Sequence, residues 1–197
     1  MKRGAKLLAA LGLAAMLAGC VQGSLWPLYT DKEVIFDAGL LGKWKDPDPA
    51  DTNIWTFTKR DDKAYTLTVE WETEEGGKDS QVYAAYLMSL GMYTFLDLYP
   101  APTEAEKAVI EKYGYVGTHD QFLVKREEDT LQTASLDEDW LEEQILEGEV
   151  RPRVAALGQG QNAYVLIGRT RELQKWFVYA AANPDAFPDF TVMKRVR

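Results

Sequence analysis

Hydrophobic and polar positions alternate with a period of two along most of the chain after residue 40, which is typical of β-strands with one buried face. The pattern predicts a hairpin from residues 55–58 and 65–71, joined by a charged turn. A second hairpin is predicted from 81–90 and 93–99, and it should lie centrally because both of its faces are apolar. Further strands are predicted over 41–44, 121–126, 130–136, 154–157, 163–168 and 190–196.

Three segments predict short amphipathic helices instead. The first follows the capping-box pair Thr103 and Glu106 and spans 104–113, the second begins after the cap Asp137, and the third begins after the cap Thr170. One apolar face of the third helix is formed by Leu173, Trp176, Phe177, Ala180 and Ala181. The expected fold class is therefore mainly β, a β-rich α+β arrangement in which an antiparallel barrel or sandwich carries three short helices.

The N-terminus has a different pattern. Three basic side chains precede an apolar run over 7–17, and Leu17, Ala18, Gly19 and Cys20 follow in the order of a secretory signal. The run is too short for a transmembrane helix, which needs about 20 residues. Residues 17–20 resemble the lipobox of bacterial lipoproteins, and the resemblance implies that the Cys20 thiol carries acyl chains such as palmitate.

This resemblance sets the expected organisation of the chain. We expect a signal peptide over 1–19, a lipidated N-terminus and short linker over 20–36, and a single globular domain over 37–197. The expected location is the bacterial cell envelope, lipid-anchored, with Val21 after the cysteine favouring the outer membrane facing the periplasm. The alternatives for Cys20 are the last residue of an ordinary signal peptide, or a buried thiol.

Composition excludes some classes of function. The chain carries a formal charge of -9, and loss of the three basic residues of the signal leaves 19 Lys and Arg against 31 Asp and Glu, or -12. Nucleic-acid binding is therefore not expected, because it requires a basic patch. With one cysteine in the chain, the domain has no disulfide framework and must be held by burial alone.

Few residues suggest catalysis. His119 is the one histidine of the chain, and no Gly-x-Ser-x-Gly motif accompanies a serine. Asp97 interrupts an apolar strand, so it is either a hydrogen-bonded structural carboxylate or a general acid or ligand contact. The acidic residues over 137–149 suggest calcium or, more simply, a solvated helix face, and the glycines over 158–161 a turn. We expect no metal and no cofactor, and Asp97 and His119 remain weak candidates for ligand binding.

Two family resemblances concern the domain. Gly42, Lys43 and Trp44 resemble the Gly-x-Trp motif of lipocalins, which implies a barrel whose Trp lies across one end, with Arg195 or Arg197 available to cover it. The chain lacks the middle motif of that family, which leaves open whether the interior is hollow or filled. More broadly, residues 40–196 look like an uncharacterised family of envelope lipoproteins, which implies a fold and a location but no activity.

Three functions remain at this stage. The first is a non-catalytic, membrane-anchored binding module for a small apolar or amphipathic ligand. The second is a structural or assembly lipoprotein that acts through contacts with another envelope protein, for which an exposed aromatic patch around Trp26 and Tyr29 would be evidence. The third is a hydrolase using His119 or Asp97, which a shared cleft would favour.

Overall fold

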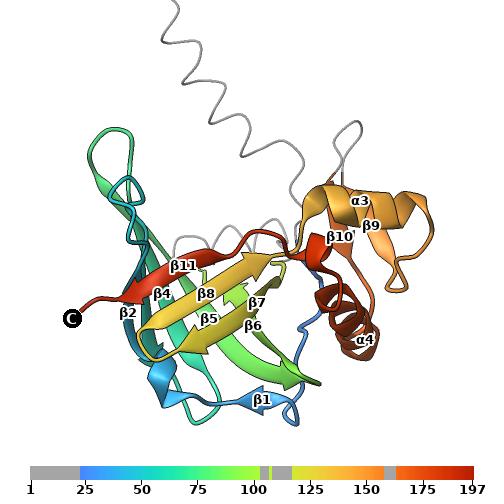
Figure 1. The fold of residues 1–197 in the computed structure, drawn as a ribbon, viewed down its shortest axis with the longest axis horizontal. Helices are drawn as coiled ribbons and strands as arrows, with labels where there is room; N and C mark the ends of the chain where they lie inside the picture. The colour runs from blue at the N-terminus through green and yellow to red at the C-terminus, as the bar shows by residue number, and fades with distance from the viewer. Residues whose placement is uncertain (1–22, 103–106, 108–116, 158–162) are drawn as a thin grey trace, which may run out of the picture.

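Eight antiparallel strands close into a barrel (Figure 1). The computed structural model describes residues 23–102, 107, 117–157 and 163–197. In order around the barrel, the strands are β5 (Lys78–Leu90), β4 (Tyr65–Glu72), β3 (Ile54–Lys59), β2 (Gly42–Lys45), β11 (Thr191–Arg195), β8 (Thr130–Ser135), β7 (Asp120–Glu127) and β6 (Tyr93–Pro100). Pairing of β6 with β5 closes the ring. The mainly β prediction is confirmed, and the architecture is the barrel rather than the sandwich.

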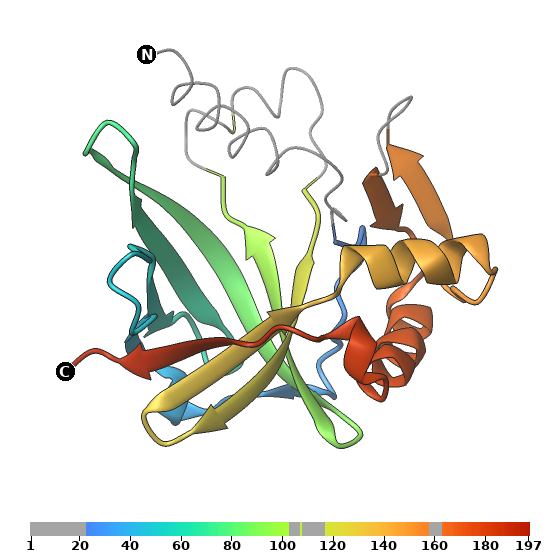
Figure 2. The same cartoon turned by 45° about the horizontal axis from the view of Figure 1, so that its top comes forward.

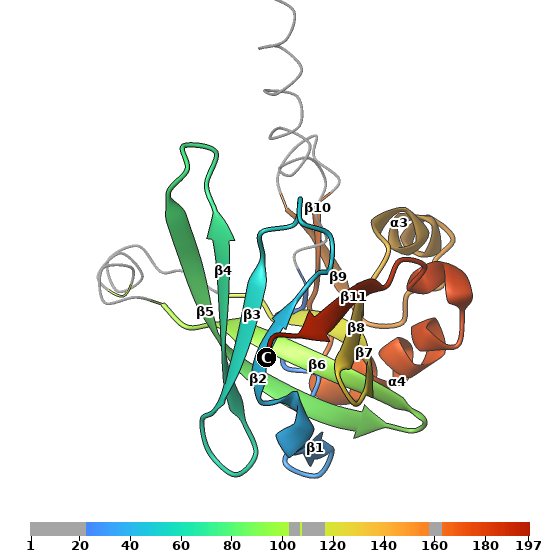
Figure 3. The same cartoon turned by 60° about the vertical axis from the view of Figure 1, so that its left-hand side comes forward.

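The two ends of the barrel differ. At the first, called the entry end, the described chain begins at Gly23, β7 begins and β8 ends. At the other, called the Trp44 end, lie the β3–β4, β5–β6 and β7–β8 turns. Figure 2 shows the β4–β5 turn opposite the β5–β6 and β7–β8 turns, and Figure 3 shows the β2–β3 loop and the β4–β5 turn at the entry end, opposite the β3–β4 turn.

Trp44 seals its end of the barrel. Its side chain is fully buried, and its Nε1–H donates to the carbonyl of Leu40 at 2.8 Å. The Arg195 guanidinium lies 4.2 Å from the centre of the Trp44 ring and donates to the carbonyl of Leu41 at 2.6 Å. Gly42 has φ of +117°, and a Cβ there would lie 2.8 Å from the Arg195 guanidinium. The structure thus explains both predicted motif residues, and it selects Arg195 over Arg197.

The middle of the barrel is filled by side chains. All eight barrel strands contribute to one cluster of buried apolar residues. Its members are Leu40, Trp44, Phe57, Tyr65, Leu67, Ala85, Leu87, Leu96, Leu98, Val124, Leu131 and Met193. Because protein interiors pack at nearly crystalline density, this cluster leaves no deep cup in the middle of the barrel.

A second core lies outside the barrel wall. The outer faces of β5 to β8 contribute Met88, Phe95, Leu123 and Ala134, and α4 (Thr170–Ala181) covers them with its predicted apolar face. α3 (Glu138–Leu146) lies on the same side of the barrel (Figure 3), and its Trp140 packs against Trp176 of α4. The central hairpin of β5 and β6 is therefore buried on both faces, as predicted.

Both described helices begin near their predicted caps. The Asp137 carboxylate accepts the Trp140 backbone N–H at 2.8 Å, which confirms the cap of α3. The predicted cap of α4 is wrong by one residue, because Thr170 is already helical and Arg169 precedes it. The Glu172 carboxylate binds the Arg169 N–H at 2.9 Å and satisfies the start of the helix instead. The predicted helix over 104–113 lies outside the described residues apart from Lys107, which is helical.

Five short elements differ from the predictions. β9 (Val154–Leu157) and β10 (Ala163–Leu166) form a separate two-stranded sheet and not part of the main one, and Leu166 of β10 also makes an isolated parallel bridge with Ser24. β1 (Val34–Ile35), which pairs with β5, was not predicted. Neither were the 3₁₀ turns η1 (Ala38–Leu40) and η2 (Pro184–Ala186). Two- and three-residue elements have no periodicity that a sequence pattern can show.

Candidate functional site

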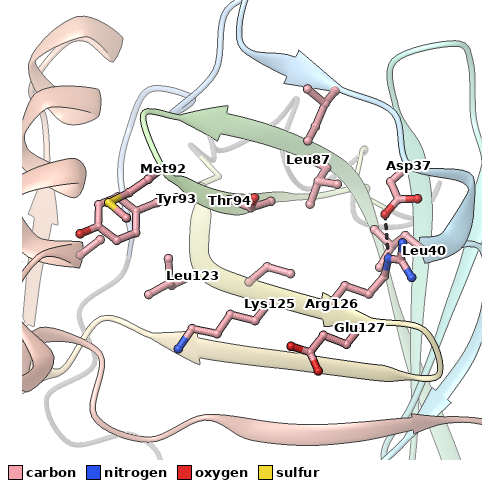
Figure 4. A pocket seen from close by; sticks show the side chains of 13 residues that line it. Asp37, Leu40, Leu87, Met92, Tyr93, Thr94, Leu123, Lys125, Arg126 and Glu127 are labelled. Carbon is pink, nitrogen blue, oxygen red and sulfur yellow. Dashed lines mark hydrogen bonds and ion pairs between the residues drawn. The ribbon is translucent and has the colours of Figure 1, made fainter.

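A gap in the barrel wall creates a pocket at the Trp44 end (Figure 4). β6 and β7 are paired only as far as Thr94 and Val124. Beyond that point β6 turns back into β5, while β7 continues through 125–127 paired with β8 alone. The missing strand contacts leave a recess, called the notch, between the β5–β6 turn, β7 and the segment that carries β1 and η1.

The notch has a mixed lining and a volume of about 460 Å³. Leu87 and Val124 belong to the barrel core and form part of its lining, and Leu123 and Tyr93 come from the core outside the wall. Polar groups border the apolar lining. They are Asp37, Thr94, Lys125, Arg126 and Glu127. Small-molecule sites are commonly apolar recesses of about 300–1,000 Å³ with a few fixed polar groups, so the notch has the size and composition of a binding site.

The charged groups of the notch are held in different ways. Arg126 Nε donates to the Asp37 carboxylate at 2.7 Å, an ion pair visible in Figure 4. Arg126 also packs beneath Gly39, where a Cβ would lie 2.6 Å from its guanidinium, so its position is fixed. The exposed Lys125 places its ammonium 4.0 Å from the centre of the Phe190 ring, on a long side chain that can turn toward a ligand. The notch therefore offers one fixed ion pair and one adjustable cation beside an apolar floor.

A smaller recess lies at the entry end. Its volume is about 200 Å³, and Trp55, Phe122, Thr133 and Met193 contribute to its lining. The rings of Trp55 and Phe122 meet edge to face with centroids 5.8 Å apart. This recess is smaller than the notch, and it serves below as a reference site.

The two weak candidates of the sequence, Asp97 and His119, meet in a buried cluster on the outer face of the wall. His119 Nδ1 lies 2.6 Å from Oδ1 of Asp97, which is fully buried, and Oδ2 accepts the Leu28 backbone N–H at 2.8 Å. Gln121 Nε2 donates to Ser24 Oγ at 2.7 Å and lies 3.4 Å from Asp97 Oδ2. These five residues are called the clasp, because they hold the start of the described chain against the barrel.

Backbone contacts strengthen the clasp. Ser24 and His119 exchange both backbone hydrogen bonds, at 2.9 and 2.8 Å, and the side chain of Gln174 donates to the carbonyl of Leu28 at 3.0 Å. Gly23 has φ of +62°, and a Cβ there would lie 2.0 Å from the His119 carbonyl oxygen. The sequence therefore needs glycine where the chain meets the wall.

The geometry of the clasp fits a structural carboxylate. The Asp97 oxygens accept from donors on three other residues, and His119 is 8 % exposed. With the carboxylate as acceptor, the His119 proton sits on Nδ1. The Ser24 hydroxyl hydrogen-bonds to the Trp26 carbonyl and to Gln121, and no contact joins it to His119 as a nucleophile would require. The contacts thus account for an aspartate in an otherwise apolar strand.

Asp120, beside the clasp, has a perturbed acidity. Its pKa is raised to about 6, first by burial and then by the negative charge of Asp97, while His119 opposes the shift. Asp120 lines a recess between the entry end of β7 and α4, with Phe122 and Phe177. The sequence did not single it out.

The other predicted site residues divide into two groups. Cys20 and the lipobox residues Leu17, Ala18 and Gly19 lie outside the described residues, as does the turn over 158–161. The acidic side chains around α3 lie within them, but no group of three or more His, Cys, Asp or Glu in the described part of the chain is placed to hold a metal ion. Asp137 has the capping role expected for an acid in a first helical turn.

The notch residues were not predicted from the sequence. A weak signal was present, because Lys125 and Arg126 are adjacent cations at the end of a strand, one facing each side of the wall. Comparison with protein-family models, curated proteins and solved structures finds no match. No helix in the described ranges is long and apolar enough to cross a membrane.

Proposed function

We propose that this protein is a lipid-anchored, non-catalytic binding module of the bacterial cell envelope, and that it holds a small amphipathic ligand in the notch. The observation that carries the proposal is the recess of about 460 Å³ in a barrel whose middle is otherwise filled. An apolar tail fits against Leu87, Leu123 and Val124, and a polar headgroup meets Lys125 and the Asp37–Arg126 pair. The anchor is the Cys20 lipid, for which the lipobox pattern is the support.

The site of binding is tested by filling each recess in turn. Thr94→Phe places a ring in the notch, and Asn53→Phe places the same ring in the entry-end recess as a matched control. Native mass spectrometry of the full, lipidated protein purified in mild detergent reports any ligand that co-purifies. We expect the ligand on wild type and on Asn53→Phe, and at least about a tenfold lower occupancy on Thr94→Phe, which corresponds to roughly 1.4 kcal/mol.

Two outcomes contradict the proposal. Wild type free of ligand argues against ligand carriage, and equal occupancy in all three proteins argues against the notch as its site. Urea unfolding of each variant shows whether the fold is retained, so that loss of ligand is not confused with loss of structure.

A second candidate is an assembly lipoprotein that acts through protein contact. Its support is a set of exposed apolar side chains outside the barrel, among them Trp26 at 49 %, Tyr179 at 55 % and Leu146 at 78 % exposure. Tyr29, by contrast, stacks on Tyr86 with ring centroids 4.0 Å apart, so the aromatic patch expected around Trp26 and Tyr29 is reduced to Trp26. Crosslinking in cells from a photoreactive residue at position 26 should capture an envelope protein under this function, and no product above background under the first.

A further inference from the structure

The clasp fixes the direction in which the chain leaves the barrel. Ser24 pairs with His119 on one side, and on the other side Leu25 N–H donates to the carbonyl of Leu166 at 2.8 Å. Leu28, four residues after Ser24, is fully buried, and hydrogen bonds hold both its N–H and its carbonyl. From Ser24 onward the chain is therefore part of the domain and not a flexible tether.

The position of the clasp brings the anchor close to one end of the barrel. His119 precedes Asp120, the first residue of β7, so Gly23 lies at the entry end. Cys20 is three residues before Gly23, and three residues span at most about 11 Å even when fully extended. The Cys20 Cα therefore lies no further than this from Gly23, and the sulfur that carries the lipid lies one side chain beyond it.

The notch is at the opposite end. β7 runs from Asp120 at the entry end to Glu127 beside the notch, and seven steps of about 3.3 Å cover about 23 Å along the strand. With the strand tilt of about 40° usual in barrels, this is roughly 18 Å along the barrel axis. The tether is too short for the domain to turn over and place the Trp44 end on the membrane without breaking the clasp, and in an upright barrel the notch lies on the far side.

From these distances we propose that the protein stands on the bilayer with the entry end of its barrel facing the lipid headgroups and the notch facing away from the membrane. The inference rests on the lipidation of Cys20 proposed above. It deepens that function, because the notch then takes its ligand from the aqueous side or from a partner and not directly from the membrane plane.

The charge distribution of the domain does not itself favour this orientation. The entry end carries acidic loops, with Asp46, Asp48 and Asp51 between β2 and β3 and Glu74 and Glu75 between β4 and β5. The Trp44 end is closer to neutral, because several of its basic side chains are paired with acids: Asp62 lies 2.7 Å from Lys59, and Asp129 lies 3.2 Å from Arg195 and 2.7 Å from Arg197. An anionic membrane attracts basic groups and repels acidic ones, so electrostatics alone would turn the barrel the other way. The short, clasped tether is what holds it upright.

Energy transfer to the membrane tests the orientation. The full, lipidated protein is reconstituted in neutral phosphatidylcholine vesicles that contain a headgroup-labelled acceptor lipid. Donor dyes are attached to Ala50→Cys in the β2–β3 loop or to Asp62→Cys in the β3–β4 turn, two exposed positions at opposite ends of the barrel. We expect transfer from position 50 to be at least about twice that from position 62.

A longer tether supplies the matched control without altering the clasp. Insertion of twelve Gly and Ser residues between Gln22 and Gly23 gives a flexible segment with an end-to-end distance of roughly 21 Å, enough for the domain to turn. We expect transfer from the two positions to become equal in neutral vesicles, and position 62 to exceed position 50 in vesicles with phosphatidylglycerol. Asp97→Asn, which weakens the clasp, should shift the ratio in the same direction.

Failure of the orientation and failure of the anchor give different results. If the unmodified tether gives equal or reversed transfer while the protein floats with the vesicles, the orientation is wrong and the anchor stands. If the protein does not float with vesicles, or if Cys20→Ser floats equally well, the anchor itself is wrong, and the orientation that depends on it fails too.

Discussion

Removing the Asp97 carboxylate should detach the N-terminal segment from the barrel. Asp97→Ala leaves the Leu28 N–H without its acceptor. The side chains of His119 and Gln121, which lie 2.6 and 3.4 Å from the Asp97 carboxylate, lose this contact too. A buried polar group without a partner costs about 1–3 kcal/mol, and Asp97→Ala leaves at least two of them, the Leu28 N–H and His119 Nδ1. We expect the free energy of unfolding, measured by urea denaturation, to fall by about 3–5 kcal/mol. Asp62→Ala, at an exposed ion pair, is the control and should leave it nearly unchanged.

A double-mutant cycle isolates the central contact. Asp97→Leu and His119→Phe each remove one polar partner and keep much of the side-chain volume. We expect a coupling energy of about 1.5–3 kcal/mol between them, as for a hydrogen bond to a charged group. Hydrogen exchange gives a local measure, because the Leu28 amide should lose protection in Asp97→Ala before the barrel amides do. Asp97→Ala with the stability of wild type, or an equally protected Leu28 amide, would refute the clasp.

Three further changes test other parts of the structure. Asp120 has a pKa of about 6 in the folded state against an ordinary value of 3.8, so the folded state binds a proton more tightly and stability falls as pH rises through this window. Asp120→Asn should therefore stabilise the protein at pH 7 by up to about 3 kcal/mol and have little effect at pH 3.5. Equal effects at the two pH values in urea unfolding would contradict the assignment. Gly42→Ala forces a side chain into the left-handed region and against Arg195, so we expect a loss of about 1–3 kcal/mol by the same measurement, whereas Gly76→Ala, at a positive φ with open space, gives the cost of the backbone alone. Arg195→Met removes the cation over Trp44 and the donor to the Leu41 carbonyl, and a loss of about 2–4 kcal/mol is expected, with Arg197→Met, at an exposed arginine, near zero.

Much of the barrel follows from local pattern. Period-two alternation located the strands of the wall, because one face of each strand meets the filled interior and the other meets water or the helices. The buried face of α4 could also be predicted, since Leu173, Trp176 and Phe177 repeat with helical spacing and are buried. Closure of the sheet into a barrel could not be predicted from the sequence. It depends on the pairing of β5 with β6 and on β11 lying between β8 and β2, and the choice between barrel and sandwich stayed open.

The site was beyond the reach of a local pattern. Asp97 and His119 were each noted alone, but their contact joins residues 22 apart and depends on the register of β6 against β7. An aspartate in an apolar strand requires a partner, and that rule could have suggested the one histidine, at the start of the next strand. The notch exists because β7 extends past β6 at one end of the barrel. Both strands have eight residues, so the cause is their relative offset in the sheet, which no single segment of sequence records.

Lipidation of Cys20 is the central claim, because both the address and the orientation of the domain depend on it. The most direct measurement is metabolic labelling of cells with an alkyne fatty acid, followed by comparison of wild type with Cys20→Ser. The account predicts a labelled wild-type protein in the membrane fraction and an unlabelled Cys20→Ser protein. Equal labelling of the two, or no label on wild type, would contradict it.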